Sequence, residues 1–143
     1  MDDGAFRIRR ADWQGDEPAI RRVRQKVFID EQGVRPDEEW DGLDARCLHV
    51  LAIDGQGAAI GTARLTEDGK VGRMAVLGPW RKKGVGAALL EALIAVARDR
   101  GIRRLSADAQ VRALGFYEEH GFVAEGPEFL DARIPHRRMY RDL

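Results

Sequence analysis

Residues 73–90 read RMAVLGPWRKKGVGAALL, and this stretch decides the fold. An apolar strand pattern ends at Leu77, and the dipeptide Gly78-Pro79 turns the chain. The clearest helical pattern in the sequence then starts at Gly84, with Val85, Leu89, Leu93 and Val96 forming one apolar stripe. The stretch therefore predicts a buried strand that leads through a tight turn into a long amphipathic helix.

The start of this helix carries the features of an anion site. The first N–H groups of a helix have no intrahelical partner and lie at the positive end of its dipole. Gly84 and Gly86 carry no Cβ, which lets a phosphate approach the backbone closely. Positive charge gathers just before them, at Arg81, Lys82 and Lys83, in a chain that is neutral overall. The turn therefore predicts a ligand that carries polyphosphate.

Two familiar phosphate motifs are excluded at this turn. The dinucleotide pattern Gly-x-Gly-x-x-Gly would need a glycine where Leu89 stands, and an acidic residue about 20 positions later, where Arg103 and Arg104 lie. The P-loop pattern Gly-x-x-x-x-Gly-Lys-Ser/Thr does not occur. A nucleotide-binding protein that uses the same helix N-terminus stays open as an alternative.

Composition predicts one domain over residues 1–143, with no repeat or linker. The 24 Lys and Arg balance 24 Asp and Glu, and a net charge of zero argues against a non-specific nucleic-acid binder. Cys47 is the one cysteine, which rules out an internal disulfide and a thiolate zinc cluster, so no metal is expected. The chain has no apolar run of membrane-spanning length, and Met1–Gly4 lacks a signal peptide's apolar segment, so we expect a cytoplasmic protein that binds no membrane.

Hydrophobic periodicity predicts a mixed α/β fold. Strands are expected at residues 6–10, 47–53, 58–66, 70–77, 102–107, 121–124 and 138–140. Helices are expected at residues 16–31, 84–100 and 111–119, and residues 32–45 form a long acidic surface loop with room for one helical turn. This order predicts one sheet in which a helix crosses over from the third meander strand to the strand near residue 103.

Two motifs in combination resemble the GNAT superfamily of N-acetyltransferases. Arg81-x-x-Gly84-x-Gly86 is similar to the acyl-CoA signature of that family, and Gln110-x-x-Ala113-x-x-Phe116-Tyr117-Glu118-x-x-Gly121-Phe122 is similar to the second half of its core. Further segments resemble the small ElaA/YjcF-like branch, namely residues 27–34, Asp41-Gly42-Leu43-Asp44, His49, Gly126-x-x-Phe129 and Ile134-Pro135-His136. Many relatives have glycine where Lys82 stands and asparagine where Gln110 stands, but neither change removes a backbone donor from the turn.

The resemblance implies a fold and a cofactor. The fold is a twisted mixed sheet of about six to seven strands with about four helices, in which two central strands splay apart to admit acetyl-CoA. The pyrophosphate would lie on the glycine turn, and the pantetheine would pair with the third meander strand as an added strand would. The cofactor-binding residues implied in this way are Met74, Ala75, Val76, Arg81, Lys82, Lys83, Gly84, Val85, Gly86, Ala87, Gln110 and Phe116.

The chemistry of acyl transfer to an amine sets what the site must supply. A lysine-like amine has a pKa of roughly 10.4, so a base must remove a proton at neutral pH. Glu31, at the end of the first helix, and His49, within a meander strand, are the base candidates, each with a structural role as its alternative. Tyr117 matches the family's tyrosine and would protonate the leaving thiolate, with a packing role as its alternative. Backbone N–H groups near Val76 would hold the carbonyl oxygen as charge develops on it.

The acidic run and His136 each have two interpretations. The acidic run at residues 37–44 is usually a solvated loop, but in this setting it would attract a cationic amine. His136 follows Pro135 and is expected to shape the C-terminal turn, with a substrate contact as the alternative.

The sequence therefore predicts an acetyl-CoA-dependent N-acetyltransferase in which a primary amine attacks directly in a ternary complex. Its alternative is a non-catalytic acyl-CoA-binding module that acts as a sensor or interaction domain. The acceptor stays open among polyamines, amino acids, aminoglycosides, and lysines of peptides or proteins. Exposed sheet edges would also permit a homodimer.

Overall fold

The computed structural model describes residues 4–143, so Met1–Asp3 of the predicted acidic N-terminus lie outside the described residues. The strands are β1 (Phe6–Ala11), β2 (Leu48–Asp54), β3 (Ala59–Leu65), β4 (Lys70–Val76), β5 (Arg104–Gln110), β6 (Val123–Asp131) and β7 (Ile134–Asp142). The α-helices are α1 (Trp13–Arg24), α2 (Pro36–Glu39), α3 (Val85–Asp99) and α4 (Leu114–Glu119). One π-helical segment (Gln25–Glu31) continues α1, and short 3-10 turns lie at Asp44–Arg46, Gly78–Trp80 and Val111–Ala113.

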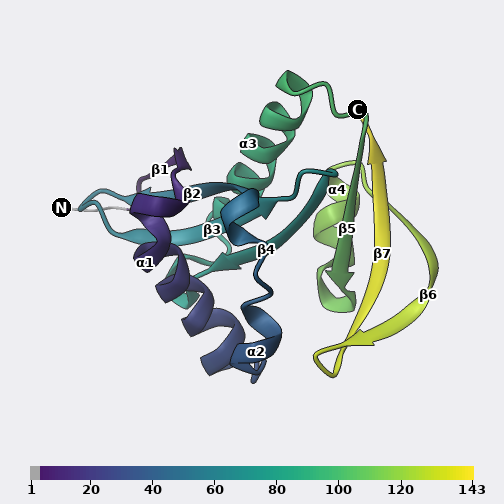
Figure 1. Ribbon diagram of the computed structural model, residues 1–143, viewed down its shortest axis with the longest axis horizontal. Coiled ribbons are helices and arrows are strands. Elements are labelled where there is room, and N and C mark those ends of the chain that lie inside the picture. Colours follow the sequence, from purple (N-terminus) through teal and green to yellow (C-terminus); the bar gives the residue numbers. More distant parts are fainter. Residues whose placement is uncertain (1–3) are drawn as a thin grey trace.

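These elements form one seven-stranded mixed sheet in the order β1-β2-β3-β4-β5-β7-β6 (Figure 1). Adjacent strands are antiparallel except β4 and β5, which are parallel and are joined by the α3 crossover. The mixed α/β fold class, the strand count and the splayed sheet predicted from the sequence are thus confirmed. The helix predicted from residue 84 and the helix-crossover topology are confirmed as well.

Two apolar layers hold helices on opposite faces of the sheet. Ile20, Val23 and Val27 of the first helix pack on Leu51, Ile53 and Ala75 on one face. On the other face, the apolar side of α3 packs on β2, β3 and β4 in a larger core that also holds Tyr117 and Phe122. Cys47 precedes β2 and is half-buried, with burial raising the pKa of its thiol. Cys47 is therefore a partly exposed, weakly acidic thiol.

Several predicted boundaries are wrong. The first helix begins at Trp13 rather than residue 16, because Asp12 starts it and the Asp16 carboxylate accepts a hydrogen bond from the Asp12 N–H at 2.8 Å. The two C-terminal strands extend to nine residues each, because a two-residue turn at Ala132-Arg133 joins them. Both turn residues have positive φ, at 50° and 67°, a conformation that the glycine-free sequence does not signal.

β4 and β5 part soon after they meet. Their parallel pairing is limited to Lys70↔Ser106 and Val71↔Ala107, after which each strand continues without the other. A bulge opposite Ala63 places two residues of β4 against one of β3, and Arg73 in that bulge has a φ of 46°. In Figure 1 the two strands visibly diverge, with β5, β7 and β6 forming a separate wing. The bulge bends β4 away from β5 and so opens the sheet.

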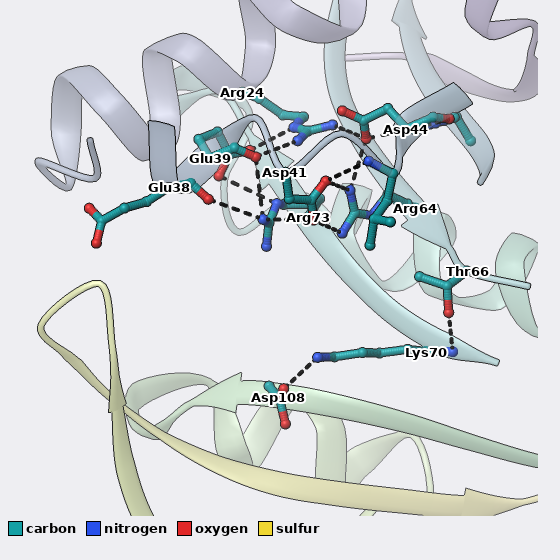
Figure 2. Close-up of polar contacts among 12 residues, drawn as sticks. Arg24, Glu38, Glu39, Asp41, Asp44, Arg64, Thr66, Lys70, Arg73 and Asp108 are labelled. Carbon is teal, nitrogen blue, oxygen red and sulfur yellow. Dashed lines mark hydrogen bonds and ion pairs between the residues drawn. The ribbon is translucent and has the colours of Figure 1, made fainter. Parts of the chain in front are cut away.

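Residues 32–45, predicted as a solvated loop, are instead held by a buried ion cluster (Figure 2). Arg24 is 0% exposed, and its guanidinium donates to Glu39 Oε2 and to Asp44 Oδ1, both at 2.7 Å. Arg64 on β3 donates to the same Asp44 oxygen at 2.9 Å. Burial would raise the pKa of Asp44, but Arg24 and Arg64 outweigh it and lower that pKa below its ordinary value. The cluster thus ties α1, α2 and the 3-10 turn at residue 44 to the sheet.

Replacing Arg24 by Met should destabilise the protein by about 3–5 kcal/mol, because Glu39 and Asp44 would be left buried beside an apolar side chain. The matched control is Arg21→Met, which breaks an exposed pair with Glu17 and should cost less than about 1 kcal/mol. Urea unfolding followed by circular dichroism measures both. Equal losses in the two variants would contradict a structural role for the cluster.

Candidate active site

A cleft of about 1100 Å³ occupies the opening between β4 and β5. Its walls come from the π-helical segment, α2, β3, β4, β5, α4 and the tip of the β6–β7 hairpin. Eight of the predicted site residues line it, namely Glu31, Met74, Val76, Arg81, Lys82, Gln110, Phe116 and Tyr117. The structure thus brings together residues that lie up to 86 positions apart, from Glu31 to Tyr117.

Strand alternation gives the cleft two chemically different sides. Ala107, Ala109 and Met139 of β5 and β7 belong to the core beneath α3 and α4, which also holds Tyr117. The alternate residues Asp108 and Gln110 point to the opposite face, the face covered by α1. There Gln110 donates to Gln32, just after the π-helical segment, at 2.9 Å. The cleft therefore joins an α3/α4 side to a polar α1/α2 side.

The α3 N-terminus lies on the α3/α4 side. Gly84 precedes the helix with a φ of 85°, a left-handed conformation that glycine adopts without strain. A Cβ at position 86 would lie 3.6 Å from the Phe116 ring and 3.7 Å from the Met74 sulfur, so Gly86 adjoins two residues that line the cleft. Val85 is buried and fixes the helix start in the core, and Ala87 completes the first turn. The first N–H groups of this turn have no intrahelical partner, and they lie beside the cleft residues Phe116 and Met74.

The backbone of β4 faces the opening at alternate residues. The Leu77 N–H, just after β4, donates to the carbonyl oxygen of Ile60 on β3 at 3.0 Å. Alternation then turns the N–H and C=O groups of Val76 and Met74 the other way, toward the cleft. The Val76 carbonyl accordingly accepts a hydrogen bond from Arg81 Nε at 3.0 Å. Ala75, between them, has its side chain buried beneath α1.

The three predicted cations differ in their surroundings. Arg81 donates to Glu31 Oε1 at 2.8 Å, and this hydrogen bond, with the charge of Arg81, lowers the pKa of Glu31. Lys82 is exposed, with a φ of 62°, and lines the cleft. Lys83 lies over the Trp80 ring, 5.3 Å from its centroid, outside the residues that line the cleft. Of the three predicted cations, Arg81 and Lys82 thus line the cleft.

Tyr117 lines the cleft from α4 and is 7% exposed. Phe116 and Phe122 make edge contacts with its ring, with centroids 5.2 and 5.4 Å away. Burial raises the pKa of Tyr117 to about 12, so the phenol keeps its proton at neutral pH. A protonated phenol in this position can donate to a ligand in the cleft.

His49 lies apart from the other predicted catalytic residues. Its side chain is 1% exposed, with the ring stacked on Trp13 at 5.0 Å and Nε2 2.8 Å from the Asp44 carbonyl oxygen. Burial lowers the pKa of His49, so the ring is neutral near pH 7. The structure therefore does not bring His49 together with Tyr117 and Glu31.

Four carboxylates of the acidic run are paired with arginine, whereas a solvated loop was expected; they are Glu38, Glu39, Asp41 and Asp44. Asp41 accepts from Arg64 at 2.8 and 3.0 Å and from Arg73 at 3.2 Å, and these partners outweigh burial to lower its pKa. Glu38 accepts from Arg133 of the β6–β7 turn at 3.1 and 3.2 Å. The hairpin tip is thereby fastened to α2 across the α1/α2 side of the cleft (Figure 2 shows Glu38 beside this hairpin).

Sequence reasoning missed several polar residues of the cleft. Arg73, Lys70 and Asp108 line it, and Lys70 Nζ contacts an Asp108 oxygen at 2.5 Å across the two strands. His136 lines it too, from within β7 rather than from a C-terminal turn. The alternation of polar and apolar residues from Arg104 to Gln110 was the signal that places Asp108 on the same face as Gln110. Among the residues described, no cluster of side chains could hold a metal ion, and no helix is long and apolar enough to cross a membrane.

Comparison with known proteins identifies the family. Residues 22–143 match the model of the acetyltransferase (GNAT) domain. The uncharacterized N-acetyltransferase YjcF of Bacillus subtilis is 39% identical over 123 residues, covering 84% of this chain and 88% of YjcF. The chain belongs to the GNAT acetyltransferase family. The resemblance noted from the glycine turn and the second core motif, including its YjcF-like branch, is thus confirmed.

Solved structures agree with this assignment. A putative N-acetyltransferase from Lactobacillus plantarum superposes with a TM-score of 0.88 at 26% identity, over 97% of this chain and 99% of that one. N-acetylglutamate synthase from Neisseria gonorrhoeae, whose structure holds coenzyme A and N-acetyl-glutamate, superposes with a TM-score of 0.72 at 25% identity. That match covers 97% of this chain and 35% of the synthase.

Proposed function

We propose that this protein transfers the acetyl group of acetyl-CoA to a primary amine of a small-molecule or peptide acceptor. The observation that carries the proposal is the parting of β4 and β5, which opens a cleft to both faces of the sheet. One substrate can enter from each side, and the two meet without a covalent enzyme intermediate. This arrangement suits direct attack of the amine on the thioester in a ternary complex.

Acetyl-CoA would occupy the α3/α4 side. Its pyrophosphate would accept hydrogen bonds from the first-turn N–H groups of α3, with Arg81, Lys82 and Lys83 adding positive charge. Its pantetheine would lie along β4 and pair with the backbone of Met74 and Val76 as an added strand would. Ala75, Gln110 and Phe116 complete the proposed set. The coenzyme A complex of the related synthase supports this choice of cofactor.

The transfer needs charge stabilised at two atoms. As the amine attacks, negative charge develops on the thioester oxygen, and the Val76 N–H would donate to it. As the C–S bond breaks, its electron pair moves to sulfur, and we assign Tyr117 to protonate that atom. The high pKa of Tyr117 supports this role, because the phenol carries its proton whenever the cofactor is bound near pH 7.

The two base candidates from the sequence differ in their support. Glu31 lines the cleft, whereas His49 lies in the core. The guanidinium of Arg81 lowers the pKa of Glu31, which weakens that carboxylate as a proton acceptor. We therefore propose that Glu31 holds Arg81 at the cofactor rim and that it is a weak base in the free protein.

An acceptor screen tests the proposal directly. Release of free thiol from acetyl-CoA is measured with polyamines, amino acids, aminoglycosides and lysine peptides. Release that depends on an acceptor supports the enzyme. Binding of coenzyme A without release for any acceptor favours the sensor module, and a thermal shift with ATP but not with coenzyme A favours a nucleotide-binding protein.

Gly84→Val should weaken coenzyme A binding at least tenfold, because the new side chain covers the N–H groups of the turn. Gly57→Val is the matched control, since Gly57 has nearly the same φ, 87° against 85°, and lies in the β2–β3 turn away from the cleft. Both variants should lose similar stability, about 1–2 kcal/mol. Isothermal titration measures binding, and unchanged affinity in Gly84→Val places the phosphates elsewhere.

Arg81→Ala should weaken coenzyme A binding less than Gly84→Val, because the backbone donors of the turn remain. The same titrations compare the two variants. A larger loss in Arg81→Ala would mean that side-chain charge rather than the helix N-terminus dominates phosphate binding.

Tyr117→Phe should keep coenzyme A affinity and thermal stability but lose kcat by roughly 10²–10⁴-fold, because it removes only the proton donor. Tyr140→Phe, at the other tyrosine of the chain, is the control and should keep kcat. Steady-state kinetics with the best acceptor of the screen give the result. Wild-type turnover in Tyr117→Phe, under conditions where chemistry limits the rate, would show that Tyr117 only packs.

A further inference from the structure

His136 occupies the α1/α2 side of the cleft. It lies on β7, opposite Gln110 of β5 and Phe129 of β6. Its side chain shares the polar face of β5, since its strand partner Gln110 points to that face and reaches Gln32. The residue is 8% exposed and lines the cleft. A ring in this place faces the acceptor, whereas Tyr117 faces the cofactor from the other side.

The hydrogen bonding of His136 fixes its tautomer. Nδ1 lies 2.6 Å from the carbonyl oxygen of Ile134. A carbonyl oxygen can only accept, so Nδ1 carries the hydrogen and the neutral ring keeps its lone pair on Nε2. Phe129 stacks on the ring at 5.8 Å and holds its plane. No hydrogen bond to Nε2 forms within residues 4–143. The ring is thus oriented with a free proton-accepting nitrogen.

The carboxylates around the cleft are engaged by cations. Burial raises the pKa of Glu39, but this carboxylate is 3% exposed and is held by Arg24 and Arg73. Glu31, Glu38, Glu39, Asp41 and Asp108 each form an ion pair with arginine or lysine. Next to His136 on the same face, Arg138 donates to Asp108, which also binds Lys70. Asp131 is exposed at the end of β6, next to the hairpin turn from which Arg133 reaches Glu38. His136 therefore offers, on this side of the cleft, a nitrogen lone pair that no neighbouring cation occupies, on a ring whose orientation is fixed.

We propose that Nε2 of His136 is the general base that deprotonates the acceptor amine, an inference that rests on the proposed acetyl transfer. Nε2 takes one proton from the ammonium group, which leaves a lone pair on the amine nitrogen. That lone pair attacks the thioester carbon and forms the C–N bond. The C–S bond then breaks with its electrons on sulfur, which takes the proton of Tyr117. The excess proton on nitrogen returns to the tyrosine oxygen, and His136 releases its proton to solvent.

His136→Asn tests the proposal, because the amide can still donate to Ile134 O but cannot take up a proton. We expect kcat/KM to fall by roughly 10²–10⁴-fold at neutral pH, with coenzyme A affinity and thermal stability unchanged. His120→Asn is the matched control, since His120 pairs with Glu91 outside the residues that line the cleft, and it should keep wild-type kinetics.

A second comparison separates a base from a residue that merely positions the acceptor. The best acceptor of the screen is compared with its analogue fluorinated beside the amine, whose lower pKa leaves more of it neutral. Loss of a base should cost the analogue at least tenfold less than the parent amine. An equal loss for both amines, or wild-type kinetics in His136→Asn, would overturn the proposal.

The wild-type protein keeps the two proposals distinguishable. Turnover in the wild type that persists in His136→Asn refutes the role of His136 alone, whereas a wild type without turnover refutes the acetyl transfer and this role with it. If the variant fails to fold, ¹⁵N spectra of the wild-type imidazole decide the matter. A ring with its hydrogen on Nδ1 supports the proposal, and a ring with its hydrogen on Nε2 overturns it.

Discussion

The parting of β4 and β5 is the constraint on which the rest of the structure depends. Two strands that separate inside a sheet leave N–H and C=O groups without their ladder partners, and each such group left buried costs about 1–3 kcal/mol. Here one of them, the Val76 carbonyl, is satisfied by the Arg81 side chain. The exposed edge of β4 is also a template for an extended ligand. The opening that weakens the sheet is therefore the feature that creates the cleft.

An open sheet needs its two wings held by something other than strand pairing. The buried cluster of Arg24, Glu39, Asp44 and Arg64 fastens α1 and α2 to the β1–β4 wing. The Glu38–Arg133 pair and the Lys70–Asp108 contact then reach across to the β5–β7–β6 wing. These links are ionic and polar, so they span the cleft without filling it with apolar side chains. Five of the residues in these links also line the polar side of the cleft, namely Glu38, Glu39, Arg64, Lys70 and Asp108.

Local signals made part of this structure predictable. The glycine turn and helix over residues 84–100 follow from an apolar stripe of period 3.6 and from glycines at the start of the helix, so the element can be predicted from sequence alone. Residues 32–45 show no period, because ion pairs to Arg24 and Arg64 hold them and such pairs leave no periodic trace. The hairpin turn at Ala132-Arg133 was missed for a related reason, since neither residue favours positive φ.

The two histidines show why site residues are harder to predict than elements. His49 and His136 both lie on strands, and only the sheet register decides that one ring faces a buried carbonyl and the other a cleft. Register depends on pairing partners far away in the chain, which no local pattern encodes. Tyr117 could be singled out from the sequence because it lies within a continuous motif, residues 110–122.

The register also assigns different chemistry to the two sides of the sheet. Acyl transfer to an amine needs a proton removed from the nucleophile and a proton delivered to the leaving group, and one group placed between them would serve both poorly. Residues that alternate along β5 separate these tasks, because Ala109 faces the core that holds Tyr117 while Gln110 faces the side of His136. In the proposed mechanism the acid would lie with the thioester and the base with the amine, and the substrates would meet where the strands part. A splayed sheet would give this separation without a conformational change, since its two faces already differ in the side chains that they present.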